Sequence, residues 1–281
     1  MAKKGLGTCK LSGVYGTFVR AHLIPKAVTR PNRPGAHFIQ AGNGSRPSKR
    51  FDSWYDEELV TRKGEDVLTA LDTWAISELR RHKLIWSGWG DDHALRTDDH
   101  VAMPDTAWGA RSIDGIDAER LRLFFLSLLW RAAATNRPEF SEVTLADDEL
   151  IQLQEAVLRR QSPPDGFYPL HLIQLSTKGE AHNQTPVAMT KHLPAYGDDG
   201  ERPVPIYRFY FEGLIAHFLR PPATGLHPSP VTALAVDHGH SIVVTTVTYD
   251  GSFQQENLAR LKFEAFSAWP APMTKLMLSD L

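Results

Sequence analysis

The sequence has little cysteine, no long apolar run and no secretory leader pattern. The single cysteine, Cys9, excludes an internal disulfide framework and an all-cysteine zinc site within the chain. The longest apolar stretch, residues 121–134, is interrupted by two arginines and is shorter than the roughly 20 residues that a membrane span needs. No apolar segment follows Lys3 and Lys4 at the start of the chain. We therefore expect a cytoplasmic protein with no membrane partner.

Several catalytic signatures are also missing. The sequence contains no Gly-rich phosphate loop, no G-x-S-x-G elbow and no dinucleotide fingerprint, so NTP-driven and serine-hydrolase functions have no support. A hydrophobic share of 42% and a charged share of 23% are typical of globular proteins. A length of 281 residues fits one large domain or two ordinary ones.

Negative charge is absent from the first fifty residues. Residues 1–50 contain ten Lys or Arg and no Asp or Glu, whereas the remaining 231 residues hold 21 basic and 33 acidic residues, a balance of −12. This asymmetry favours a nucleic acid as the partner, because basic side chains that neutralise phosphates supply most non-specific affinity. The residues expected to contact it are Lys10, Arg20, Lys26, Arg30, Arg33, Arg46, Lys49 and Arg50. The alternatives are that these cations pair with the acidic remainder of the chain or with a partner protein.

Periodicity predicts three helices in the first 160 residues. The first begins after Gly64 and ends near residue 83, with apolar residues at spacings of three and four. A second begins near Asp117 with a wide apolar face and stops at Pro138, and a third covers residues 147–160. A short hairpin is expected within residues 11–22. Residues 29–49 and 84–116 are expected to be loops, because they are rich in turn-forming residues or lack a clear period.

The second half has a different texture. Residues 167–175, 205–218, 231–236 and 241–249 are rich in β-branched and aromatic residues and predict strands. An antiparallel sheet packed on helices gives an α+β fold. We expect two parts, a basic module over residues 1–83 and an α+β body over residues 84–281, with helices at about 117–160 and strands at about 167–249.

The first 65 residues carry the most informative motif. CKLSG at residues 9–13 is followed by HLIPK at 22–26, a loop, and WYDEELVTRKGE at 54–65. Over about residues 9–80 this order resembles the treble-clef members of the HNH endonuclease family. Those proteins usually read C-x-x-C, a hairpin ending in H-I-x-P, a loop, a second cysteine pair and a helix. The resemblance implies a treble-clef, ββα-metal-like N-terminal module.

The resemblance also implies a function and a site. His22 falls on the family's catalytic histidine, the general base that activates water, and is a candidate metal ligand. Asp56 falls near the family's middle Asn, and Glu65 falls on its last metal-ligand position. The implied activity is phosphodiester hydrolysis with one Mg²⁺ or Mn²⁺, as in DNA endonucleases of bacterial or phage defence and mobile elements. Carboxylate ligands suit these cations.

The sequence departs from the family pattern at four positions. Ser12, Thr61 and Gly64 stand where three knuckle cysteines are usual, so no structural zinc is expected and packing must replace it. Ala21 stands where the family often has a metal-binding acid, so Asp72, His82 or a phosphate oxygen must complete the shell. The alternative is a catalytically inactive HNH-derived protein that binds nucleic acid or a protein partner. A homo-oligomer also stays open.

Two further groups of residues have metal-ligand chemistry. Asp-Asp-His occurs at residues 91–93 and again at 98–100, and an Asp-His-Gly-His segment occupies residues 237–240. Imidazole and carboxylate are suitable ligand types. A solvated polar loop and a hairpin turn with exposed histidines are the simpler interpretations.

Overall fold

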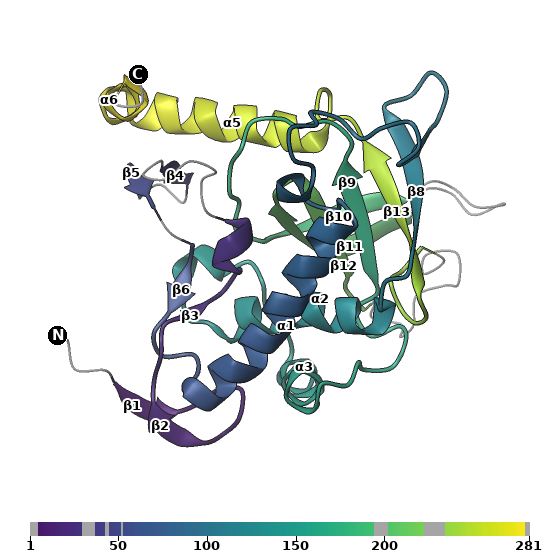
Figure 1. Ribbon diagram of the computed structural model, residues 1–281. Helices are drawn as coiled ribbons and strands as arrows, with labels where there is room; N and C mark the ends of the chain where they lie inside the picture. The colour runs from purple at the N-terminus through teal and green to yellow at the C-terminus, as the bar shows by residue number, and fades with distance from the viewer. Residues whose placement is uncertain are drawn as a thin grey trace.

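A computed structural model describes residues 5–29, 37–42, 45–51, 53–193, 202–221 and 234–278. Helices and a large sheet pack around a shared core, which confirms the predicted α+β class (Figure 1). No helix in the described part of the chain is long and apolar enough to cross a membrane. Arg30 and Arg33 lie outside the described residues.

A seven-stranded sheet forms one side of the core, in the order β10-β11-β12-β9-β13-β8-β7. Its strands are β7 (Val101–Ala102), β8 (Trp108–Asp114), β9 (Leu170–Leu175), β10 (Val187–Leu193), β11 (Arg202–Phe211), β12 (Leu214–Leu219) and β13 (Ser241–Val247). β13 runs parallel to β9, whereas every other neighbouring pair is antiparallel. The predicted antiparallel sheet thus contains one parallel pair: β12, β11 and β10 extend the sheet from one edge of β9, and β13 lies along its other edge.

Several predicted boundaries in the second half need correction. The run 205–218 is not one strand but β11 and β12, joined by a tight turn in which Glu212 and Gly213 adopt positive φ. β8 lies within the predicted loop 84–116, and β10 was not predicted. Of the predicted strand 231–236, residues 231–233 lie outside the described residues and Val236 forms only a single bridge.

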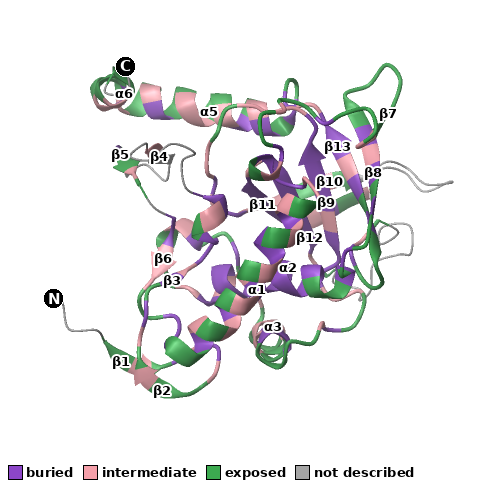
Figure 2. Cartoon of the chain, viewed as in Figure 1, coloured by how far each residue is buried: buried purple, intermediate pink, exposed green. Residues whose placement is uncertain are grey.

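Helix α2 (Ala118–Ala134) is the central helix of the core. Its apolar residues occur around almost the whole circumference, and 14 of its 17 residues are buried (Figure 2). Asp117 caps its N-terminus by accepting a hydrogen bond from the backbone N–H of Arg120. Phe125 stacks on Phe211 of the sheet at 6.0 Å. α3 (Asp147–Arg159) packs beside α2, as the periodicity predicted.

Helix α1 (Arg62–Arg81) is held by the sheet at its C-terminal end. Arg111 of β8 donates hydrogen bonds to the carbonyl oxygens of His82 (3.0 Å), Lys83 (3.3 Å) and Asp99 (2.8 Å), and to Gln174 Oε1 (2.5 Å). Lys83 ends the helix in a left-handed conformation, with φ of 53°. The guanidinium of Arg111 thus supplies the hydrogen bonds that water would otherwise make to the carbonyl oxygens at the C-terminal end of α1.

The N-terminal segment builds three small two-stranded ladders. β1 (Leu6–Thr8) pairs with β2 (Tyr15–Thr17), β3 (Ala21–His22) pairs with β6 (Tyr55–Asp56), and β4 (Phe38–Gly42) pairs with β5 (Ser45–Arg50). The predicted hairpin at 11–22 is therefore displaced toward the N-terminus. The β4–β5 hairpin also corrects the predicted loop at 29–49.

The two predicted parts of the chain share one hydrophobic core. The largest buried cluster includes Leu23 and Leu71 from the first part together with Phe124, Leu128 and Phe209 from the second. Near the C-terminus, α5 (Phe253–Ala268) and α6 (Pro270–Leu278) were not predicted, and they lie against β4 and β5, respectively (Figure 1). The N-terminal module is thus embedded in the rest of the protein rather than carried on a separate linker.

Candidate active site

The motif histidine lies in the short β3–β6 ladder. His22 is opposite Tyr55, and Ala21 is opposite Asp56, so the side chains of His22 and Asp56 leave the ladder on different faces. The two residues after His22, Leu23 and Ile24, are fully buried and anchor the segment in the core. His22 itself is half-buried: its Nε2 atom is buried, whereas other atoms of the residue are exposed.

Glu65 reaches the same place from α1. It lies in the first turn of that helix, where its backbone N–H donates to the Thr61 carbonyl at 3.0 Å. His22 and Glu65 both line a surface cleft of about 510 Å³. The polar side chains around them in this cleft are Lys26, Thr69, Asp72, Thr73, Ser77 and Arg80. The spacing of these α1 residues places them on one face of the helix, so α1 forms one wall and the segment after β3 forms the other.

The four positions that correspond to knuckle cysteines lie close together. The backbone N–H of Ser12 donates to Cys9 Sγ at 3.4 Å, and a Cβ added at Gly64 would lie 2.7 Å from the same sulfur. Burial raises the pKa of the Cys9 thiol, but hydrogen bonds from Ser12 and from the Thr61 backbone outweigh it and lower the pKa. Cys9 is 1% exposed, so a packed sulfur and a glycine occupy the centre of this group of positions.

The two acids of the cleft differ in their surroundings. Asp72 forms a bidentate pair with the guanidinium of Arg131, with Oδ1 at 2.5 Å and Oδ2 at 3.0 Å. For Glu65, burial is the largest influence and raises the pKa of the carboxyl; the nearby charge of Arg131 lowers it and that of Asp72 raises it. Within the described residues, no hydrogen bond or salt bridge engages the Glu65 carboxylate.

The third predicted ligand lies elsewhere. The Asp56 carboxylate accepts a hydrogen bond from Thr135 Oγ1 at 2.5 Å and another from the Glu58 backbone N–H at 2.8 Å. It does not line the cleft, and neither does His82, whose backbone carbonyl caps α1 against Arg111. His22 and Glu65 therefore line the same cleft, whereas Asp56 does not.

The described residues contain no group of three or more His, Cys, Asp or Glu side chains placed to hold a metal ion. The Asp-Asp-His segments are used for local structure: Asp99 pairs with Lys83 at 3.1 Å, and Asp92 pairs with Arg96 at 3.2 Å. In the Asp-His-Gly-His segment at residues 237–240, His238 Nε2 lies 2.8 Å from Asp165 Oδ1.

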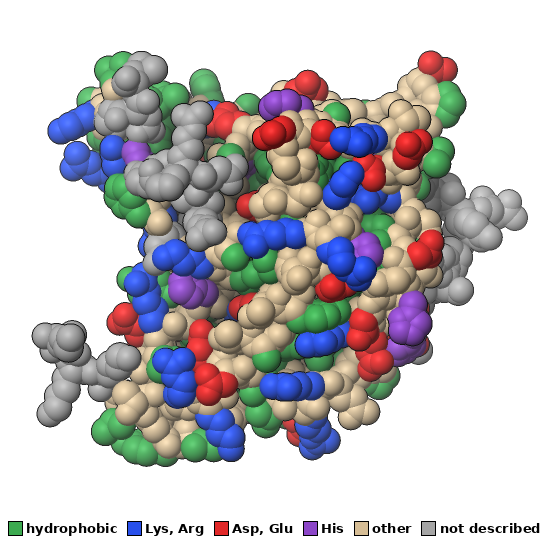
Figure 3. Space-filling model, viewed as in Figure 1, with side chains coloured by type: hydrophobic (Ala, Val, Ile, Leu, Met, Phe, Trp, Pro, Cys, Tyr) green, Lys and Arg blue, Asp and Glu red, His purple; other side chains and the backbone are tan. Residues whose placement is uncertain are grey.

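The predicted basic contacts fall into two groups. Lys10 and Arg50 are engaged within the protein: Lys10 Nζ donates to the Ala134 carbonyl, and Arg50 Nε donates to Gln40 Oε1. The exposed ones are Arg20, Lys26, Arg46 and Lys49. Arg20 lies over the Tyr55 ring at 3.4 Å, beside His22. Lys and Arg side chains lie over β3–β6 and the β4–β5 hairpin, and others are spread over the rest of this face among Asp and Glu side chains (Figure 3).

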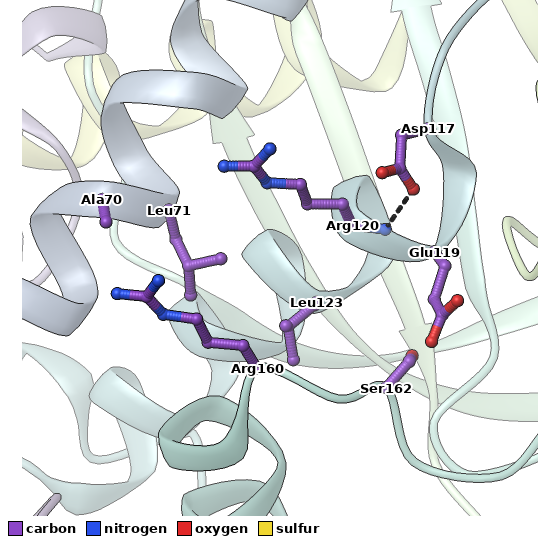
Figure 4. Close-up of a pocket in the computed structure, with 8 residues that line it drawn as sticks. All are labelled: Ala70, Leu71, Asp117, Glu119, Arg120, Leu123, Arg160 and Ser162. Atoms are coloured by element: carbon purple, nitrogen blue, oxygen red, sulfur yellow. Dashed lines mark hydrogen bonds between the residues drawn. The ribbon is translucent and has the colours of Figure 1, made fainter.

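A second hollow, of about 420 Å³, lies at the N-terminus of α2. Figure 4 shows Arg120 and Arg160 on its walls together with Asp117 and Glu119, and the Asp117 carboxylate bonds to the backbone N–H of Arg120. The helix end is thus satisfied by its own cap. Two cations balance two acids, and the described residues that line the hollow include no histidine.

Sequence reasoning missed Arg131 and the pairing of Asp72. Arg131 is 1% exposed on α2, and its Nη1 also donates to the His22 carbonyl at 3.2 Å. The available signal was a charged residue within the apolar face of a helix predicted to be buried. Such a residue needs a buried partner, because an unpaired charge in a core is costly.

The comparisons with known proteins add no relative. Neither a family model, nor a curated protein, nor a solved structure matches the chain. Any function must therefore be argued from the motif and from the geometry of the cleft.

Proposed function

We propose that the protein is an HNH-like, metal-dependent phosphodiester hydrolase that acts on DNA, as endonucleases of bacterial or phage defence and mobile elements do. The observation that carries the proposal is the convergence of His22 and Glu65 on one cleft, although 43 positions separate them in the chain. The clustering of Cys9, Ser12 and Gly64 supports it, because the HNH pattern requires these positions to meet.

The residues of the cleft fit a single Mg²⁺ or Mn²⁺. Glu65 supplies a half-buried carboxylate oxygen that no cation among the described residues neutralises by direct contact. The His22 imidazole lines the same cleft and serves as the base rather than as a ligand. Such cations keep several water ligands, so one or two protein ligands and a substrate phosphate suffice. A cation bound here would polarise the phosphate and stabilise the leaving oxygen.

The protein's own residues have separate tasks in this proposal. His22 accepts a proton from the attacking water at an imidazole nitrogen, and its packed neighbours Leu23 and Ile24 fix the ring beside the cleft. Glu65 would hold the cation through its carboxylate. Lys26 lies on the rim and attracts the phosphate backbone, while Arg46 and Lys49 of the β4–β5 hairpin extend this attraction along the same side.

Plasmid nicking with Mg²⁺ or Mn²⁺ tests the proposal. The wild type should nick the plasmid, His22→Ala should be slower by about 10²–10⁴-fold, and Glu65→Gln should need a higher cation concentration. His240→Ala is the matched control, since His240 is exposed in a turn far along the chain. Equal nicking by the wild type and His22→Ala would remove His22 from the mechanism.

A catalytically inactive, HNH-derived binding protein is the second candidate. The loss of three knuckle cysteines and the presence of Ala21 at an acid position favour it. This candidate predicts DNA binding that weakens with salt, no nicking in either cation, and unchanged affinity in Glu65→Gln. Nicking that depends on both His22 and Glu65 would exclude it.

A further inference from the structure

One buried cation connects the two walls of the cleft. The guanidinium of Arg131 donates to the His22 carbonyl (3.2 Å), both Asp72 oxygens (2.5 and 3.0 Å) and Ser127 Oγ (3.2 Å). His22 belongs to β3, Asp72 to α1, and Arg131 to α2 (Figure 1). A single buried side chain of α2 therefore joins the two elements that form the walls of the cleft.

This contact restrains the position of the imidazole. β3 has only two residues, and its ladder with β6 contributes few hydrogen bonds. The bond from Arg131 to the His22 carbonyl fixes the peptide plane from which the imidazole projects. Asp72 follows Glu65 by seven residues, so both lie on the same face of α1. The fork of Arg131 thus sets the distance between the histidine and the carboxylate.

The guanidinium of Arg131 also determines which of the two acids in the cleft has an ion-pair partner. Asp72 is 18% exposed and lines the cleft, but its charge is compensated by the bidentate pair. Glu65 lacks such a partner among the described residues. Arg131 therefore pairs with one carboxylate of the cleft and leaves the other without a direct ion pair in the described part of the chain.

We propose that Arg131 is the positioning residue of the cleft: its pairing with Asp72 and its bond to the His22 carbonyl set the His22–Glu65 geometry. This inference rests on the proposed function. Arg131 touches neither substrate nor cation, so its effect passes through the two residues that it holds.

The test compares two buried arginines of the same helix. Arg131→Lys keeps the positive charge but loses the planar guanidinium that binds several acceptors at once. Arg122→Lys is the matched control. Arg122 is also 1% exposed, but its guanidinium binds Ser162 Oγ and the carbonyl oxygens of the 163–167 loop. We expect Arg131→Lys to lower kcat by about 10–100-fold with KM within about twofold, because a small misplacement of catalytic groups has such effects. Arg122→Lys should leave both parameters unchanged. Equal kinetics in the two variants would overturn the inference.

A readout without catalysis separates this inference from the proposed function. The ¹³Cε1–¹H resonance of His22, assigned by its loss in His22→Ala, reports ring position in a protein that does not need to cut DNA. We expect this resonance to shift in Arg131→Lys and to stay in place in Arg122→Lys. A wild type that never nicks DNA but shows this difference would refute the nuclease and retain the positioning role. An unchanged resonance in both variants would refute the positioning role.

Discussion

Gly64→Ala tests whether the four knuckle positions meet as described. The new Cβ would lie 2.7 Å from Cys9 Sγ and 3.0 Å from Val60 Cβ, well inside van der Waals contact. Overpacking of this kind costs about 1–3 kcal/mol. Replacing glycine by alanine in a helix returns about 0.5–1 kcal/mol. The net expectation is a loss of about 1–2 kcal/mol in the free energy of unfolding.

The partner mutation makes the test specific. Cys9→Ala removes the sulfur and should cost about 1 kcal/mol through lost burial. In the double variant the methyl group added at position 64 occupies part of the space that the sulfur left. The two costs should therefore not add, and we expect a coupling energy of about 1 kcal/mol. Gly16→Ala is the control, because its Cβ would only touch Thr61 Cγ2 at 3.4 Å.

Urea unfolding followed by circular dichroism measures these differences through the transition midpoints at constant slope. Gly64→Ala and Cys9→Ala should each lower the midpoint, Gly16→Ala should leave it nearly unchanged, and the double variant should lie above the additive expectation. Additive costs within about 0.5 kcal/mol, or a stabilising Gly64→Ala, would show that the sulfur and the helix start are not in contact.

Three further predictions follow from named contacts. Burial raises the pKa of Glu65 and disfavours its charged form. Glu65→Gln should therefore raise the midpoint of urea unfolding at pH 7. This gain should vanish below the ordinary glutamate pKa, because the Glu65 carboxyl is then protonated in both the folded and the unfolded chain. Arg111→Met should lower the free energy of unfolding by about 2–4 kcal/mol, because it leaves carbonyl oxygens at the end of α1 without their hydrogen-bond donor. An unchanged midpoint of urea unfolding would show that these hydrogen bonds do not stabilise the fold. Arg46→Ala and Lys49→Ala should each reduce, by about 0.9, the slope of the logarithm of the DNA-binding constant against the logarithm of the salt concentration. An unchanged slope would show that the DNA does not contact the β4–β5 hairpin.

The parts of the fold that the sequence predicted are those with strong local signals. The wide apolar face and the Asp117 cap fixed α2, and regular spacing fixed α1 and α3. The turn between β11 and β12 was missed because it consists of only Glu212 and Gly213, inside a continuous apolar run. The β4–β5 hairpin was missed because its composition is typical of a loop, and its support comes from α5 and α6, which are distant in sequence.

The candidate site was predictable only where a motif described it. The order of the N-terminal motifs placed His22 and Glu65 in one cleft, because ladder pairing and the helix start are local consequences of that order. Asp56 was assigned by its distance along the chain, but the two-residue alternation of the ladder turns its side chain away from His22. Arg131 could not be found in this way, because its partners His22 and Asp72 are separated from it by 109 and 59 positions.

The location of a bound Mn²⁺ ion tests the central claim most directly. Crystals soaked in Mn²⁺ should show an anomalous peak in the cleft, within coordination distance of a Glu65 carboxylate oxygen and beside the His22 imidazole. The peak should disappear in crystals of Glu65→Gln soaked in the same way. A wild-type cleft without a peak, in crystals that bind Mn²⁺ elsewhere, would contradict the account.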